Sequence, residues 1–155
     1  MSMNTKRRLF LRGSAAVGAV MGAGMLVPSQ VLAASLQESF RMQDAGEAMT
    51  ALLGSSEAEE SDKVSITAPE IAENGAVVPI TVSSELEGVD SISIFVTENP
   101  TPLVASFTLG EGALATAATR IKMGQTSDVV GVVRANGKLY KASREVKVTV
   151  GGCGG

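Results

Sequence analysis

From residue 63 onward, short segments rich in Val, Ile and Thr alternate with turn-forming residues. These segments cover 63–68, 76–83, 90–97, 102–109, 115–122, 127–135 and 138–150. Branched side chains favour the extended, pleated backbone, so each segment is predicted to be a β-strand. Along 145–150, three valines alternate with charged or polar residues. This alternation predicts a strand with one buried face and one solvated face.

Two Asn-Gly pairs mark tight turns between these strands. Asn74-Gly75 precedes the second strand, and Asn136-Gly137 separates the last two, where it predicts a two-residue hairpin. About seven short strands with regular turns predict a mainly β protein, an immunoglobulin-like antiparallel β-sandwich over residues 63–150. The Cys-Trp-Cys pattern of antibody domains is absent, so the prediction concerns the general architecture.

A helix is predicted before the sandwich. Ser35-Leu36-Gln37-Glu38 fits a capping box, and Gly54 is a natural stop. Residues 35–53 therefore form one predicted helix, which we expect to cover the core of the sandwich rather than pack on a partner. Residues 55–62 are polar and acidic, and we interpret them as a solvated linker, so 34–62 is the helix-and-linker region. The apolar positions at helical spacing are Leu36, Phe40, Ala45, Met49, Leu52 and Leu53.

Residues 1–33 have the layout of an export signal. The pair Arg7-Arg8 is followed by a weakly apolar, glycine-containing run over 13–27 and a small-residue end. This order fits the twin-arginine pathway, which exports folded proteins, and predicts a periplasmic location. Cleavage is expected after Ala33, with Ala34 as the alternative. A membrane anchor is less favoured, because the run is short and rich in glycine.

Charge and composition exclude several classes of function. Cleavage after Ala33 removes four basic residues and no acidic ones, which leaves nine basic and 16 acidic residues and a net charge of −7. Such a chain is a poor ligand for nucleic acid and for anionic membranes. It contains no histidine and one cysteine, so a zinc site and a Ser-His or Cys-His catalytic pair are excluded. We predict no metal site and no cofactor.

The candidate for chemistry is Cys153, at the C-terminus. Glycines surround it at positions 151, 152, 154 and 155, directly after the last predicted strand. Glycine adds no side-chain bulk, so this segment is predicted to be a flexible arm that carries the sulfur about 10 Å beyond the sandwich and into a narrow channel. A lone cysteine in an exported chain stays free, joins another molecule or is modified. An incidental cysteine in a disordered tail and a lipid anchor are less favoured.

Three features together resemble the SoxY family, the sulfur-carrier subunits of bacterial thiosulfate oxidation. They are the signal around Arg7-Arg8, the segment Ala68-Pro69-Glu70-Ile71-Ala72-Glu73-Asn74-Gly75, and the ending Gly151-Gly152-Cys153-Gly154-Gly155. The resemblance implies a non-catalytic carrier whose substrate is attached covalently to Cys153. Gly151, Gly152, Gly154 and Gly155 would then form the arm.

The resemblance also implies partners. A SoxZ-like subunit would form a heterodimer with the chain, or a heterotetramer joined through Cys153. The haem protein SoxAX would couple thiosulfate to the cysteine, SoxB would release sulfate by hydrolysis, and a molybdenum–haem sulfane dehydrogenase would oxidise the remaining sulfur. The alternative from the residues themselves is an exported interaction module that dimerises through a Cys153 disulfide. An enzyme is less favoured, because the sequence has no histidine, metal cluster or nucleotide motif.

Overall fold

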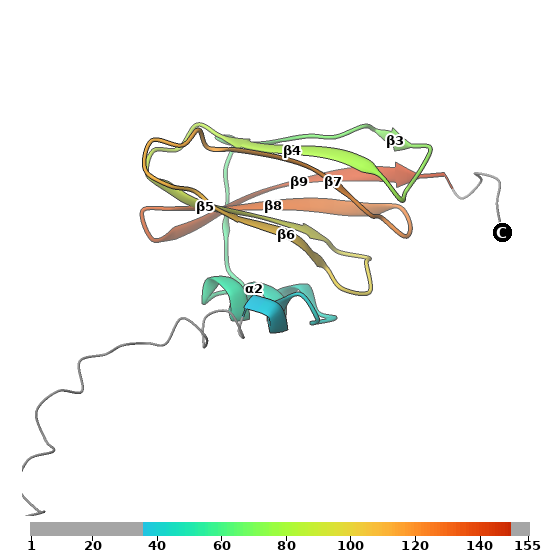
Figure 1. Cartoon of the computed structure of the whole chain (residues 1–155), viewed down its shortest axis with the longest axis horizontal. Coiled ribbons are helices and arrows are strands. Elements are labelled where there is room, and N and C mark those ends of the chain that lie inside the picture. The colour runs from blue at the N-terminus through green and yellow to red at the C-terminus, as the bar shows by residue number, and fades with distance from the viewer. Residues whose placement is uncertain (1–35, 150–155) are drawn as a thin grey trace, which may run out of the picture. The chain divides into compact units, whose positions relative to one another are not determined.

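The computed structural model describes residues 36–149; residues 1–35 and 150–155 lie outside the described part. Within 36–149 the chain forms a helical turn at 36–39, one longer helix and nine strands, most of them in two facing sheets (Figure 1). The labelled elements are α2 (Ala45–Leu53), β1 (Glu59–Glu60), β2 (Val64–Thr67), β3 (Ile71–Ala72), β4 (Val78–Ser84), β5 (Val89–Val96), β6 (Leu103–Thr108), β7 (Thr116–Ile121), β8 (Ser127–Ala135) and β9 (Lys138–Val148).

The seven predicted strands are all present, with ends that differ by at most two residues from the prediction. The larger sheet has the order β1-β9-β8-β5-β6, and the smaller sheet has the order β2-β4-β7. The main neighbours pair antiparallel, as β8 and β9 do from Ser127↔Val146 to Ala135↔Lys138. Asn136 and Gly137 join these two strands with φ of 51° and 76°, which is the two-residue hairpin that the sequence predicts. The mainly β sandwich is therefore confirmed.

The main core lies between the two sheets. Alternate residues of each strand point into it, including Ile92 and Ile94 of β5 and Ile80 and Val82 of β4, all 0–1% exposed. Gly131 of β8 lets the sheets approach closely, because a Cβ there would lie 2.9 Å from Cγ1 of Val82. Branched aliphatic side chains fill this space, which explains how the chain folds without tryptophan.

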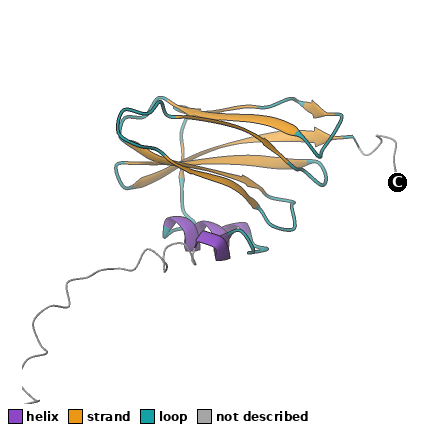
Figure 2. Ribbon diagram, viewed as in Figure 1, coloured by secondary structure: helices purple, strands orange, loops and turns teal. Residues whose placement is uncertain are grey.

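A second apolar cluster lies on the outer face of the larger sheet. The helices, purple in Figure 2, lie on this side of the sandwich. Phe95, Leu103 and Val132 from the sheet pack with Ala48 and Met49 of α2. Phe95 is adjacent to the core residue Ile94 and points to the opposite face. The helix thus covers the sandwich of its own chain, as expected.

The single helix predicted over 35–53 is wrong. A helical turn at 36–39 is followed by a break, and α2 begins only at Ala45. Asp44 causes this new start, since its side chain accepts a hydrogen bond from the Glu47 N–H at 2.8 Å. The predicted stop is correct: Gly54 has φ of 83°, and its N–H donates to the Thr50 carbonyl at 2.9 Å. Ser35, the predicted cap, lies outside the described residues.

The Asp44 cap gives a first prediction. Asp44→Ala should lower the free energy of unfolding by about 1 kcal/mol, because the Glu47 N–H loses its acceptor. Asp44→Asn is the matched control, since asparagine caps helices about as well, and it should leave the stability nearly unchanged. Urea denaturation of the three proteins measures the difference. Equal loss in both variants would show that the carboxylate charge, rather than the cap, matters.

Two short strands were not predicted, and both pair in parallel with β9. Glu59–Glu60 pairs with Tyr140 and Lys141, and Ile71–Ala72 pairs with Lys147 and Val148. The region 55–62 is therefore not only a linker: the side chains of β1 are exposed, but its backbone joins the sheet. Together the two strands occupy part of an edge of β9 that would otherwise be open to pairing with other chains. No helix among residues 36–149 is long and apolar enough to cross a membrane.

Candidate functional site: the support of the β9 end

The residues predicted from sequence to carry the function lie outside the described part of the chain. These are Cys153, the arm glycines 151, 152, 154 and 155, and the signal pair Arg7-Arg8. The structure describes the chain as far as Thr149, four residues before Cys153. The site can therefore be built from the residues that hold the end of β9, where the chain leads into the predicted arm (Figure 1).

The pairing of β8 with β9 stops at Val146, but the backbone of β9 stays hydrogen-bonded beyond it. The next three backbone N–H groups each donate to a different acceptor. Lys147 donates to the Glu70 carbonyl at 3.0 Å, Val148 to the Thr126 hydroxyl at 3.0 Å, and Thr149 to the Ala72 carbonyl at 3.2 Å. Successive N–H groups of a strand point to opposite edges, so the strand end is held from both sides.

The segment 70–75 provides the acceptors on one side and is itself fixed. Ala72 is 5% exposed and belongs to the main core. Asn74 closes the following turn, because its side-chain oxygen accepts from the Ala76 N–H at 2.9 Å and its carbonyl accepts from the Val77 N–H at 3.3 Å. This segment, which carried part of the resemblance, thus forms β3 and leads into β4.

Gly75 has no room for a side chain. A Cβ at this position would lie 2.4 Å from the Met123 carbonyl oxygen and 2.9 Å from Cγ1 of Val148. The Gly75 carbonyl in turn accepts from the Met123 N–H at 2.7 Å. Gly75 therefore joins three parts of the chain: the turn after β3, the loop after β7 and the end of β9. We call residues 70–75 together with Thr126 the strand-end support.

Polar contacts fix the neighbouring loops. The Asn99 side chain donates to the Lys122 carbonyl at 2.8 Å and accepts from the Gly124 N–H at 3.1 Å. Ser127, 4% exposed, accepts from the Glu98 N–H at 3.0 Å. These bonds connect the β5–β6 loop to the segment between β7 and β8, next to Thr126. They are structural contacts and bring no nucleophile, base or metal ligand together.

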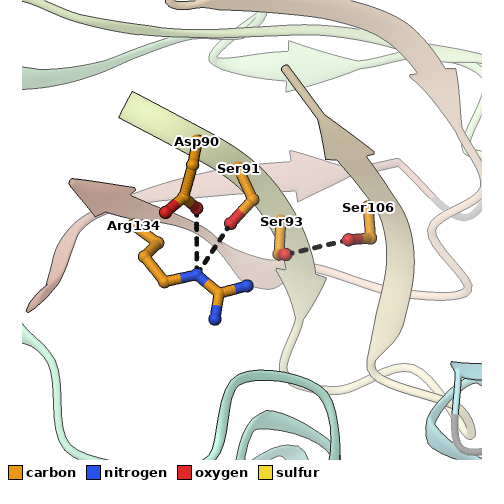
Figure 3. Close-up of polar contacts among 5 residues, drawn as sticks. All are labelled: Asp90, Ser91, Ser93, Ser106 and Arg134. Carbon is orange, nitrogen blue, oxygen red and sulfur yellow. Dashed lines mark hydrogen bonds and ion pairs between the residues drawn. The ribbon is translucent and has the colours of Figure 1, made fainter. Parts of the chain in front are cut away.

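A second polar cluster lies on the larger sheet (Figure 3). Nε of Arg134 contacts Oδ1 of Asp90 at 3.0 Å and the Ser91 hydroxyl at 3.3 Å, while Ser93 and Ser106 share a hydrogen bond of 3.1 Å. Ser93 is fully buried and lies directly opposite Ser106 in the register, so this bond satisfies a buried hydroxyl. The ion pair is largely exposed and contributes little to stability.

Two surface hollows lie away from the strand-end support. One open hollow lies beside the loop 109–115, and another lies between the end of α2 and the β8–β9 hairpin. The strand registers place both toward the start of β9, at the opposite end of the strand from Thr149. Within residues 36–149, no three acidic, histidine or cysteine side chains are grouped so that they could hold a metal ion.

Comparison with known proteins identifies the family. A family model described as "Sulfur oxidation protein SoxY" matches residues 49–153. The chain belongs to the SoxY family. The match begins in α2, runs through both sheets and the strand-end support, and ends on Cys153.

Solved structures agree with the SoxY assignment. The sulfur carrier protein SoxY from Chlorobium limicola f thiosulfatophilum is 47% identical, with a TM-score of 0.61, and the match covers 67% of this chain and 94% of that chain. A superoxide reductase (neelaredoxin) from Ignicoccus hospitalis is 17% identical, with a TM-score of 0.51 and coverage of 56% and 80%. The second similarity shows a shared fold alone. A search of curated proteins found no match.

The SoxY match confirms the family that the sequence motifs predicted. Cys153 stays a prediction from the composition around it, whereas the sequence did not reveal that Thr126, Ala72 and Gly75 hold β9. The acceptors that hold Lys147 and Thr149 are backbone carbonyls. Every residue type has one, so the sequence does not reveal these acceptors. The signal in the sequence is the segment 68–75, which predicts a turn at Asn74-Gly75 and carries part of the resemblance.

Proposed function

We propose that this protein is a periplasmic, non-catalytic carrier of sulfur intermediates in thiosulfate oxidation, with its substrate attached covalently to Cys153. The observation that carries the proposal is the SoxY match, which ends on Cys153, the sole cysteine of the chain. The relative that is 47% identical is itself a sulfur carrier protein. The twin-arginine pattern at Arg7-Arg8 supports export to the periplasm.

The geometry of the strand end suits such a carrier. Thr149 is hydrogen-bonded to Ala72, and Cys153 follows four residues later. Four extended residues reach at most about 14 Å, so the sulfur stays within that radius of a fixed point. Attachment of a small anion to the sulfur prevents loss of the anion by diffusion and raises its effective concentration at successive enzymes. The glycines on both sides of Cys153 keep the segment narrow enough for a tight channel.

The proposed chemistry takes place on Sγ of Cys153, and partners supply the catalysis. In loading, the thiol gives up its proton, the outer sulfur of thiosulfate bonds to Sγ, and two electrons pass to a haem oxidant of the SoxAX kind. In hydrolysis, a water oxygen bonds to the sulfonate sulfur, sulfate leaves, and two protons go to solvent. A persulfide then remains on Cys153 for further oxidation. SoxB-like and sulfane-dehydrogenase-like enzymes are the proposed catalysts of these two later steps.

A second subunit of the SoxZ kind is the proposed permanent partner. The family membership supports a partner from the same sulfur-oxidation system. The chain offers no histidine for catalysis, so we propose that it works only as part of such a system and holds no cofactor. The alternative, a module that dimerises through Cys153, makes a different prediction about the same sulfur atom.

The mass of one peptide tests the proposal. Trypsin cleaves after Lys147, so Cys153 lies in the peptide 148–155. After incubation of the full chain and its second subunit with thiosulfate and a SoxAX-class haem protein, this peptide should gain about 112 Da, and after sulfate release about 32 Da, as expected for a thiosulfonate and a persulfide. Cys153→Ser is the matched control and should gain neither mass. A peptide found only as a disulfide dimer would overturn the proposal in favour of the dimerising module.

A further inference from the structure

We propose that the strand-end support, residues 70–75 with Thr126, is a positioning element that sets the point from which Cys153 is presented. This inference rests on the proposed function, because it concerns the delivery of the attached sulfur to partner enzymes. The support contacts no substrate. It acts through the backbone of residues 147–149, which it holds in line with β9 after the pairing with β8 has ended.

Three hydrogen bonds carry the argument. Without the support, the last residue paired within the sandwich would be Val146, which is fully buried. The bonds from Lys147, Val148 and Thr149 to Glu70, Thr126 and Ala72 extend the held strand by three residues, or about 10 Å. The fixed point for Cys153 is therefore Thr149 instead of Val146.

The support is well suited to this role, because it belongs to the folded body. Ala72 is part of the main core, and Gly75 lies so close to Met123 and Val148 that a Cβ would not fit there. Thr126 is next to Ser127, whose hydroxyl is bonded to the β5–β6 loop. The acceptors for residues 147–149 thus come from two parts of the sandwich, the segment that contains β3 and the residue before β8. A fixed point built in this way keeps both the position and the direction of the strand end.

The number of residues beyond the fixed point determines what Cys153 can reach. From Thr149 the reach is at most about 14 Å, and from Lys147 it would be about 21 Å. For a long arm, the effective concentration of the cysteine at a nearby site falls with the −3/2 power of the arm length. An increase from four to six residues therefore lowers this concentration by only about a factor of two. An arm that is too short to enter an active site loses far more. The support should therefore matter most when the arm is shortened.

This asymmetry allows a compensation experiment. Deletion of Gly151 and Gly152 places the cysteine two positions after Thr149, a reach of about 7 Å. The release pair, Thr126→Val with Thr149→Pro, removes the acceptor for the Val148 N–H and the donor N–H of residue 149, so the fixed point moves back to Lys147. In the combined protein, the cysteine again lies four positions after the fixed point. Thr126→Ser with Thr149→Val is the matched control, since it keeps the hydroxyl and the backbone N–H.

The experiment uses the full chain with its second subunit and measures kcat/KM for thiosulfate loading by the SoxAX-class haem protein. We expect the deletion to lower kcat/KM by about tenfold or more, the release pair to restore most of it, and the control pair to restore none. The reaction of Cys153 with a small disulfide reagent should stay within about twofold throughout, because it needs no particular reach. Amide hydrogen exchange should show faster exchange of residues 147–149 in the release pair alone.

Three results would overturn the inference. They are a release pair that restores nothing, a control pair that restores as much, and amides at 147–149 that stay protected in the release pair. Failure of the proposed function has a different signature, since the unmodified chain would then take up no thiosulfate on Cys153. If the wild-type protein is loaded but the release pair does not restore kcat/KM in the deletion protein, the positioning role alone is contradicted.

Discussion

Transfer of the cysteine from the C-terminal segment to the far end of the sandwich is expected to abolish turnover of thiosulfate. The double variant Cys153→Ser, Leu114→Cys keeps one thiol per chain. Leu114 is 85% exposed and lies just before β7, whose first residue pairs with Ser83 near the end of β4. This is the opposite end of the strands from Thr149. An accessible thiol there lacks both the glycine arm and the strand-end support, so we expect the rate with the partner enzymes to fall by about 10²–10⁴-fold.

The control for this prediction is the reactivity of the transferred thiol. A small disulfide reagent should react with the cysteine at position 114 about as fast as with Cys153, since both are expected to be ordinary exposed thiols. Leu114→Cys with Cys153 retained should keep full turnover, which excludes damage to a docking surface. If the transferred thiol were loaded and processed at the wild-type rate, an exposed sulfur atom anywhere on the protein would suffice, and the position of Cys153 would carry no function.

The long strands could be predicted from sequence because several independent signals coincide in them. β8 and β9 combine branched residues, alternation and the Asn136-Gly137 turn, whose two positive φ angles suit these residue types. β1 and β3 carry no such signal. Each has two residues, and each exists only because β9 presents an edge beside it. Pairing of this kind depends on tertiary structure, and local sequence does not encode it.

The N-terminal region shows how a correct period can give a wrong boundary. Of the predicted apolar positions, Phe40 and Met49 pack into the outer cluster, whereas Leu36 is 42% exposed. The pattern does not show that the chain turns between Phe40 and Met49. The decisive residue is Asp44, which caps α2 through the Glu47 N–H and thereby ends any continuous helix from residue 36.

The candidate site also has one part that the sequence predicts and another that it does not reveal. Cys153 stands out in the sequence because it is a lone cysteine among glycines, a composition that has few structural explanations. The residues that hold Lys147 and Thr149 could not be predicted, because Glu70 and Ala72 act through backbone carbonyls and any residue type supplies those. The need for glycine at position 75 arises from contacts with Met123 and Val148, which are far apart in sequence. The sequence thus supplies the candidate for chemistry, whereas the residues that hold the strand end before it required the fold.

The largest effect on stability is expected from the outer cluster rather than from the strand end. Phe95 is 1% exposed and packs with Ala48 and Met49 of α2. Phe95→Ala should lower the free energy of unfolding by about 3–5 kcal/mol, because it removes a buried aromatic ring and leaves a cavity between sheet and helix. Leu114→Ala, at an exposed position, should change it by less than about 0.5 kcal/mol and is the control. Denaturant unfolding of the purified full chain measures both.

A double-mutant cycle with Met49 then shows whether helix and sheet form one folded unit. Because Met49 and Phe95 belong to the same cluster, the cost of Met49→Ala should differ by about 0.5–3 kcal/mol between the wild-type and Phe95→Ala backgrounds. Strict additivity would mean that α2 does not pack on Phe95. In that case α2 would be free to cover another protein, and residues 36–53 would belong to a subunit interface. Coupling within the expected range instead assigns α2 to the body that holds β9, whose larger sheet is then covered on both faces.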